Sequence, residues 1–128
     1  MATRSRIAIQ NKDGTLWSVY CHWDGQVYHN GKILVEHYET EEQVRFLINQ
    51  GDMSSLDIKP QLCEHYHRKS PHDEPLIILG SLSFEQVVQQ AKTEGSDFLY
   101  LFKDGDWWVK VLNTRLREEN LQLVFSLI

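Results

Sequence analysis

The feature that most constrains the fold is a repeated alternation of side chains around Asp-Gly turns. Apolar and polar residues alternate with a period of two through residues 4–23, on both sides of Asp13-Gly14, and again through 97–113, on both sides of Asp104-Gly105. A period of two is typical of β-strands, and Asp-Gly between two such runs is a strong hairpin signal. The sequence therefore predicts two β-hairpins, one near each end of the chain.

Three short helices are predicted between and beside these hairpins. Residues 31–38, 41–50 and 84–93 place apolar side chains at helical spacing. Capping-box patterns begin at Thr40 and Ser83, which supports the second and third helices. Hairpins at both ends with only short helices between them favour an α+β fold, in which a mostly antiparallel sheet carries about three short helices packed on one face.

The second strand of the first hairpin is predicted to have an apolar and a polar face. Side chains two positions apart in a strand share a face, so Trp17, Val19, Cys21 and Trp23 lie together. We therefore expect Cys21 to be buried, reduced in the cytosol and not catalytic, because a catalytic cysteine needs a partly exposed, electropositive setting.

The middle of the chain, residues 52–75, is predicted to be irregular because three prolines interrupt it. Cys63 lies in this polar stretch, and we expect its thiol to react faster than that of Cys21. A buried strand is predicted at 76–80. The apolar tail 121–128 is expected to be either a strand of the sheet or a subunit interface.

The strongest metal candidates lie in the same middle stretch. In an extended segment Cys63, His65 and His67 project to one face, and His72 follows closely. The paired CxxC and HxxxH signatures of structural zinc sites are missing, which favours an exposed histidine-rich loop over a zinc site. We therefore predict no bound metal and no other cofactor.

The charge balance argues against bulk DNA or RNA binding. Thirteen Lys and Arg residues oppose 18 Asp and Glu residues, for a net charge of −5, so no overall positive field attracts a phosphate backbone. The apolar runs are far shorter than the roughly 20 residues that cross a bilayer. The first ten residues carry no apolar signal pattern. We expect one cytoplasmic domain, 1–128, without membrane contact.

Aromatic and cationic side chains form the remaining candidate site. If the first hairpin pairs as predicted, its more polar face carries Arg4, Arg6, Tyr20 and His22. Trp108 could add a stacking surface from the same or a neighbouring subunit. Arginine pairs with phosphate and aromatic rings stack on bases, so this set could bind a nucleotide, with Arg6 at the surface and of little weight in folding stability. The alternative is that the tryptophans belong to the core and the arginines are solvated edge charges.

Several short motifs resemble those of a known group of proteins. An arginine-bearing strand, an Asp-Gly turn, Tyr-Cys-His-Trp-Asp-Gly at 20–25 and Gly-Asp-x-Ser-Ser-Leu at 51–56 resemble a family of small proteins encoded by tailed phages and prophages. The later run FLYLFKDGDWWVKV is a weaker echo of the same family. Many members have Tyr-Pro after the Asp-Gly pair, where this chain has Gln26-Val27, so no role is assigned to that loop.

This family is similar in turn to the Thoeris anti-defence sponges, phage proteins that sequester a cyclic ADP-ribose signal. The resemblance implies a non-enzymatic phage or prophage accessory protein that binds a cyclic nucleotide as a homo-oligomer, without cleaving it. Two alternatives stay open. The chain could bind and inhibit a host defence protein directly, as a nucleic-acid mimic or groove blocker. It could also be a small zinc- or cysteine-dependent enzyme.

Overall fold

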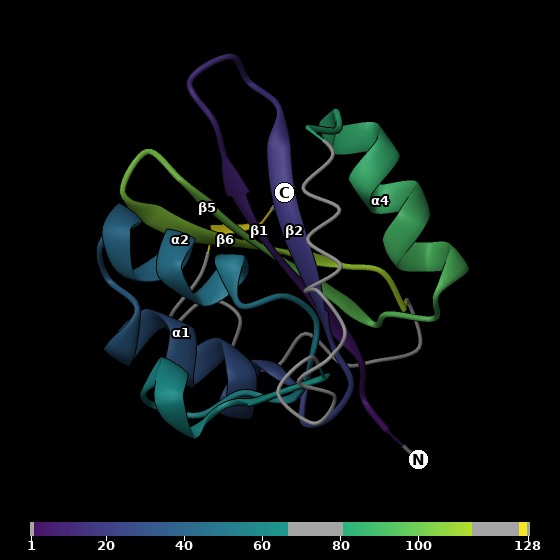
Figure 1. Cartoon of the computed structure of the whole chain (residues 1–128). Coiled ribbons are helices and arrows are strands. Elements are labelled where there is room, and N and C mark those ends of the chain that lie inside the picture. Colours follow the sequence, from purple (N-terminus) through teal and green to yellow (C-terminus); the bar gives the residue numbers. More distant parts are fainter. Residues whose placement is uncertain (1, 67–80, 114–125, 128) are drawn as a thin grey trace.

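The described part of the chain forms one mixed sheet of seven strands, with helices on both of its faces (Figure 1). The computed structural model describes residues 2–66, 81–113 and 126–127. The strands lie in the order β4-β3-β2-β1-β5-β6-β7. Their bounds are β1 Ser5–Gln10, β2 Leu16–Cys21, β3 Met53–Ser55, β4 Glu64–His65, β5 Phe98–Lys103, β6 Asp106–Val111 and β7 Ser126–Leu127.

The three predicted helices are confirmed. They are α1 Lys32–His37, α2 Glu41–Asn49 and α4 Phe84–Thr93, together with a π-helical turn, η1 Val27–Gly31, and a 3-10 turn, η2 Pro60–Leu62. Both predicted capping boxes are formed. The hydroxyl oxygens of Thr40 and Ser83 each accept a 3.2 Å hydrogen bond from a backbone N–H of the first helical turn, and these bonds fix where α2 and α4 begin.

Both predicted hairpins are also confirmed, and a parallel pair of strands joins them. The antiparallel ladders β1–β2 and β5–β6 each pair six residues. Between them β1 runs parallel to β5 over five pairs, so β1 lies at the centre of the sheet. The central position agrees with the burial of β1, because Ser5 to Ile9 are all buried and a strand covered on both faces shows no alternation of exposure.

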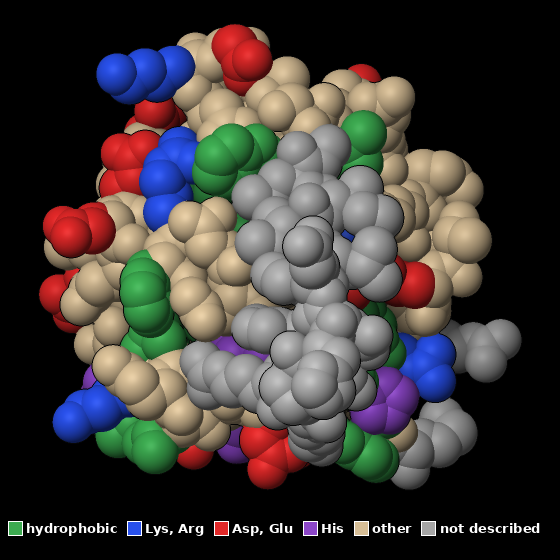
Figure 2. Space-filling model, viewed as in Figure 1, with side chains coloured by type: hydrophobic (Ala, Val, Ile, Leu, Met, Phe, Trp, Pro, Cys, Tyr) green, Lys and Arg blue, Asp and Glu red, His purple; other side chains and the backbone are tan. Residues whose placement is uncertain are grey.

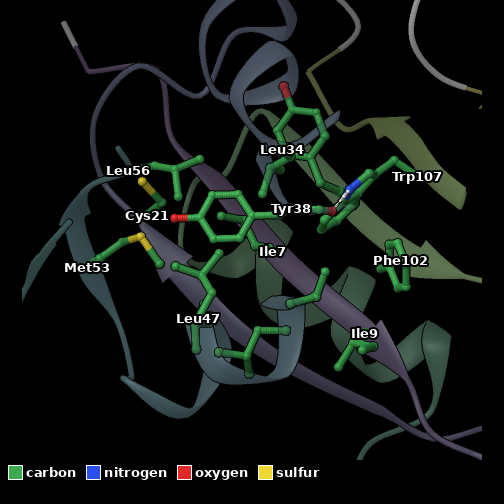
Figure 3. Close-up of a cluster of buried hydrophobic side chains, with 14 of the residues drawn as sticks. Ile7, Ile9, Cys21, Leu34, Tyr38, Leu47, Met53, Leu56, Phe102 and Trp107 are labelled. Carbon is green, nitrogen blue, oxygen red and sulfur yellow. Dashed lines mark hydrogen bonds between the residues drawn. The ribbon is translucent and has the colours of Figure 1, made fainter. Parts of the chain in front are cut away.

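One face of the sheet packs against α1 and α2 (Figure 3). Ile7 and Ile9 of β1 lie in this cluster with residues of both helices, including Leu34 and Leu47. The indole N–H of Trp107 donates a 2.9 Å hydrogen bond to the backbone carbonyl oxygen of Tyr38. This bond joins the end of α1 to β6. Val19 and Cys21 belong to the same core, as the apolar face of β2 predicted.

The other face packs against α4, which corrects the prediction that all helices lie on one face. Ala8, Leu99 and Leu101 form a second buried cluster with Val87 of α4, and Figure 1 shows α4 on the opposite side of the sheet from α1 and α2. The cause is the run Phe98–Lys103, in which apolar side chains point to both faces. Each face must then be covered to remove apolar area from water.

Two further expectations are corrected. The middle of the chain is not irregular throughout, because β3, η2 and β4 lie within 52–65 and extend the sheet beyond β2. Trp23 does not share the core with Cys21, since its side chain is 48% exposed. β2 ends at Cys21 and Asp24 takes a left-handed conformation with φ 58°, so the alternation of the strand stops before it reaches Trp23.

Two predicted segments lie wholly or mostly outside the described residues. The strand at 76–80 lies outside the described residues, and so does most of the tail 121–128. Its two described residues form β7, which pairs parallel with Trp108 and Val109 of β6. In the part of the chain that the structure covers, no helix has the length and apolarity needed to span a membrane.

Candidate functional site

Four of the five predicted site residues gather on the α4 side of the sheet, near the end of that helix. Arg6 on β1 lies directly opposite Tyr20 on β2 in the antiparallel ladder. Arg4 directly precedes β1, which begins at Ser5. His22 follows β2. Because side chains two positions apart point to the same face of a strand, the hairpin presents all four together.

Arg6 is buried, which corrects the expectation that it lies at the surface. Its side chain is only 7% exposed, because the carboxyl end of α4 covers it. The Nε atom donates a 2.9 Å hydrogen bond to the hydroxyl of Ser18. The Nη1 atom lies 3.2 and 3.3 Å from the two carboxylate oxygens of Glu94. Among the described residues, no group accepts a hydrogen bond from Nη2.

Arg4 is held beside Arg6 by Glu94 and Asp97. Its Nη1 atom donates a 3.2 Å hydrogen bond to the carbonyl oxygen of Glu94. Its own backbone N–H and carbonyl are both bound by Asp97, at 3.2 and 2.8 Å. The guanidinium lies over Gly95, where an added Cβ would come within 2.8 Å of Nη1. Gly95 therefore ends α4 at φ +84° and also leaves room for Arg4.

A row of aromatic rings continues from the two arginines. The phenol oxygen of Tyr20 lies 2.7 Å from Nδ1 of His22. The imidazole of His22 makes an edge-to-face contact with Trp23, with ring centroids 4.7 Å apart. Tyr66, 43% exposed, follows β4. The row thus places a hydrogen-bonding pair next to a half-exposed indole, which is a surface on which a flat heterocycle can stack.

The loop that carries Trp23 is held from inside by a buried amide. Asn30, at the end of η1, donates from Nδ2 to the carbonyl oxygen of Trp23 at 3.1 Å and lies 3.4 Å from the hydroxyl of Ser5 and from the thiol of Cys21. A buried amide keeps its position when its hydrogen bonds are satisfied. The motif at residues 20–25 therefore acts as a fold signature that presents Trp23.

The electrostatics of the site are mixed. Burial raises the pKa of Glu94, and this effect exceeds the opposing attraction of Arg6. Burial also raises the pKa of the Tyr20 phenol, against the lowering effect of Arg4. Asp52, just before β3, accepts a 2.9 Å hydrogen bond from the backbone N–H of Tyr20. Both guanidiniums therefore lie in the field of the Glu94 carboxylate.

Trp108 is not brought to the other four. It lies on β6, two strands away from β1, and packs against the cluster under α4. Its indole N–H donates a 3.3 Å hydrogen bond to the carbonyl of Lys103, whose ammonium lies 5.8 Å from the ring centroid. Trp108 therefore lies apart from the other four residues within the subunit, and its stacking role stays a prediction. The indole that does lie beside His22 is that of Trp23.

The predicted metal candidates are divided. Cys63 is 3% exposed, and its sulfur accepts a 3.1 Å hydrogen bond from the backbone N–H of Asp57. Its thiol is therefore buried, and a faster reaction than that of Cys21 stays a prediction. His65 is buried, with Nδ1 2.9 Å from the carbonyl oxygen of Gly51. His67 and His72 lie outside the described residues. Within the described ranges, no three His, Cys, Asp or Glu side chains are arranged to hold a metal ion.

Cys21 is poorly suited to nucleophilic chemistry. It is fully buried, and burial raises the pKa of its thiol to about 12. Near neutral pH almost none of the thiolate, the reactive form, is present. The chemistry offered by the exposed part of the site is instead ion pairing, hydrogen bonding and stacking.

Sequence reasoning missed the groups that position the arginines, namely Glu94, Ser18 and Ser96. Ser96 donates a 2.9 Å hydrogen bond to Glu94. One signal was present, because Glu94 stands at the carboxyl end of a helix, where the helix dipole disfavours a negative charge. An acid in that position indicates a compensating cation nearby.

No protein-family model, no curated protein and no solved structure matches this chain.

Proposed function

We propose that this chain is a non-enzymatic phage or prophage accessory protein that binds a cyclic nucleotide signal, such as a cyclic ADP-ribose isomer, and sequesters it in the cytoplasm of a bacterial host. The observation that supports this proposal is the pair of guanidiniums beside the aromatic row. Arg4 and Arg6 are both held by Glu94, and Arg6 keeps a donor nitrogen for a ligand. Two adjacent guanidiniums suit the planar, bidentate recognition of phosphate.

The aromatic row supplies the second half of the recognition. The base of the ligand stacks on Trp23, whose ring is fixed by the edge contact with His22 and by the hydrogen bond from Asn30 to its backbone. The hydrogen-bonded Tyr20 and His22 pair lies between the phosphate and the base and can bind a ribose hydroxyl. Binding of this kind sequesters a ligand and requires no cleavage step.

Isothermal titration with cyclic ADP-ribose tests the proposal. Arg4→Ala removes a charge-assisted contact and is expected to weaken binding by about 1.5–3 kcal/mol, roughly ten- to a hundredfold. Trp23→Ala is expected to weaken it by about 1–3 kcal/mol through lost stacking. Arg45→Ala is the matched control and is expected to leave affinity unchanged, because this α2 guanidinium pairs with Glu41 and lies over the ring of Trp17 on β2.

The fate of the ligand and the assembly are tested separately. Nucleotide released by heating the complex is expected to have an unchanged mass, and analytical ultracentrifugation is expected to show a homo-oligomer. A ligand recovered in cleaved form contradicts the sponge proposal, as does a wild-type protein that binds no isomer of cyclic ADP-ribose.

A second candidate function is direct inhibition of a host defence protein, and one surface feature favours it. Glu36, Glu39, Glu41 and Glu42 are all exposed around α1 and α2, and acidic side chains gather along that edge in Figure 2. A basic groove of a partner would complement such an edge. A pull-down from host lysate with wild type and with Glu39→Lys/Glu42→Lys tests it, since capture of a partner should be lost on charge reversal.

A further inference from the structure

We propose that the carboxylate of Glu94 competes with the anionic group of the ligand for Arg6, so that Glu94 is a specificity-determining residue and binding is coupled to the uptake of one proton. This inference rests on the proposed function, because it concerns the same pair of arginines. The Glu94 carboxylate already occupies Nη1 of Arg6 at 3.2 Å. A phosphate that approaches Nη2 of the same guanidinium therefore comes close to a resident negative charge.

Nearby carboxylates already balance the positive charges of Arg4 and Arg6. Arg4 and Arg6 approach it from the β1 side, Tyr20 from β2, and Asp52 from the segment before β3. Asp97, before β5, holds the backbone of Arg4. The nearby carboxylates at least match the guanidiniums in number. In a partly buried site both attraction and repulsion between charges are much stronger than in water.

Protonation of Glu94 removes this competition. Its side chain is 24% exposed, so a proton from solvent can reach it. Burial has already raised the pKa of the group, which lowers the cost of protonation. Once neutral, Glu94 keeps its contact with Ser96 and frees Nη1 of Arg6 for a second bond to the ligand.

The sign of the pH dependence follows from linkage. A bound anion disfavours the charged form of Glu94, so the pKa of Glu94 is higher in the complex than in the free protein. The complex then carries more protons than the free protein between those two pKa values. Affinity is expected to rise as pH falls through the pKa of the complex and to level off below the pKa of the free protein.

Calorimetry on the wild-type protein measures this directly. Titrations with cyclic ADP-ribose in two buffers with different heats of protonation give the number of protons taken up. Inorganic sulfate serves as a second probe, because it keeps its charge near neutral pH. Glu94→Gln is expected to bind both probes roughly tenfold more tightly than wild type and without proton uptake. Glu85→Gln, an exposed acid in the first turn of the same helix, is expected to behave as wild type.

Each outcome decides a different point. Nucleotide binding without proton uptake, or equal affinity of Glu94→Gln and wild type, overturns the role of Glu94 and leaves the proposed function standing. Proton-linked binding of sulfate without binding of nucleotide supports Glu94 and removes the proposed ligand. Absence of binding to both probes overturns both proposals. If Glu94→Gln does not fold, the proton uptake of wild type alone decides.

Discussion

The phenol of Tyr100 donates a 2.6 Å hydrogen bond to the backbone carbonyl oxygen of Gly25. Tyr100 is fully buried on β5, and Gly25 follows Asp24 in the loop that carries Trp23. The backbone N–H of the same glycine donates a 2.8 Å hydrogen bond to the carbonyl of Thr3. The carbonyl of Gly25 thus holds the loop to β5, and its N–H holds the loop to the segment before β1. The position of Trp23 therefore depends on the parallel pairing of β1 with β5.

Replacement of Tyr100 by phenylalanine tests this link. The change removes the donor and leaves the carbonyl of Gly25 without it in a buried setting, which is expected to lower the free energy of unfolding by about 1–3 kcal/mol. Urea denaturation measures the loss. Tyr66→Phe is the matched control, because that ring is partly exposed and its change should stay within about 0.5 kcal/mol. Equal losses in the two variants contradict the importance of the buried bond.

An alanine at position 25 should also disturb the site. An added Cβ would lie 2.9 Å from the carbonyl carbon of Arg4 and 2.9 Å from the carbonyl oxygen of Thr3, both backbone atoms that cannot simply rotate away. We expect a loss of about 2–3 kcal/mol in unfolding free energy and weaker nucleotide binding, because Arg4 must move. Gly14→Ala meets no atom within 4 Å but has φ +87°, and about 1 kcal/mol of strain is expected there. A thermal melt separates the two, and a Gly25→Ala protein as stable as wild type excludes the clash.

The buried pair of Arg6 and Glu94 predicts a double-mutant effect on stability. Arg6→Met leaves the Glu94 carboxylate without its ion-pair partner. The expected cost is about 2–3 kcal/mol, less than the roughly 3–5 kcal/mol of a fully buried pair, because Glu94 still reaches solvent. Adding Glu94→Leu removes the unpaired charge and should recover part of this loss. Urea denaturation of the two single variants and the double variant measures the coupling. Strictly additive losses would show that the ion pair contributes nothing.

The two thiols are expected to react slowly in the native protein. Cys21 is fully buried with its pKa raised to about 12, and Cys63 is buried within the turn that follows β3. Near pH 8 we expect both to label at least roughly 100-fold more slowly than in the urea-unfolded chain. A coloured disulfide reagent followed over time gives the rates. If either thiol reacted within the mixing time, that cysteine would lie at the surface and the prediction would be wrong.

Local elements were predictable from the sequence because their signals are local. The Asp-Gly turns fixed both hairpins, and Asp104 has a positive φ of 53° with Gly105 at +78°, as such turns require. The capping boxes at Thr40 and Ser83 located the starts of α2 and α4. Each signal lies within a few residues of the element that it defines, so no knowledge of the rest of the fold was needed.

Most of the features that the sequence did not predict depend on contacts between distant segments. Nothing in the neighbourhood of Arg6 shows that the end of α4 will cover it, because Glu94 is 88 positions away. The parallel pairing of β1 with β5 joins strands more than 80 positions apart and carries no sequence signal of its own. The burial of Cys63 likewise depends on β3 and on Tyr38, whose phenol oxygen lies 3.6 Å from its sulfur.

The central position of β1 has a consequence for synthesis on the ribosome. Arg4 and Asp97, which join β1 to the start of β5, lie 93 positions apart. At a translation rate of about 5–20 residues per second, β1 waits roughly 5–20 s for its parallel neighbour to emerge. During that interval the β1 edge of the first hairpin is unpaired, and side chains that are buried in the folded protein are exposed. Nascent chains can associate on such an edge. Slower translation of this chain should therefore favour its capture by chaperones over its spontaneous folding.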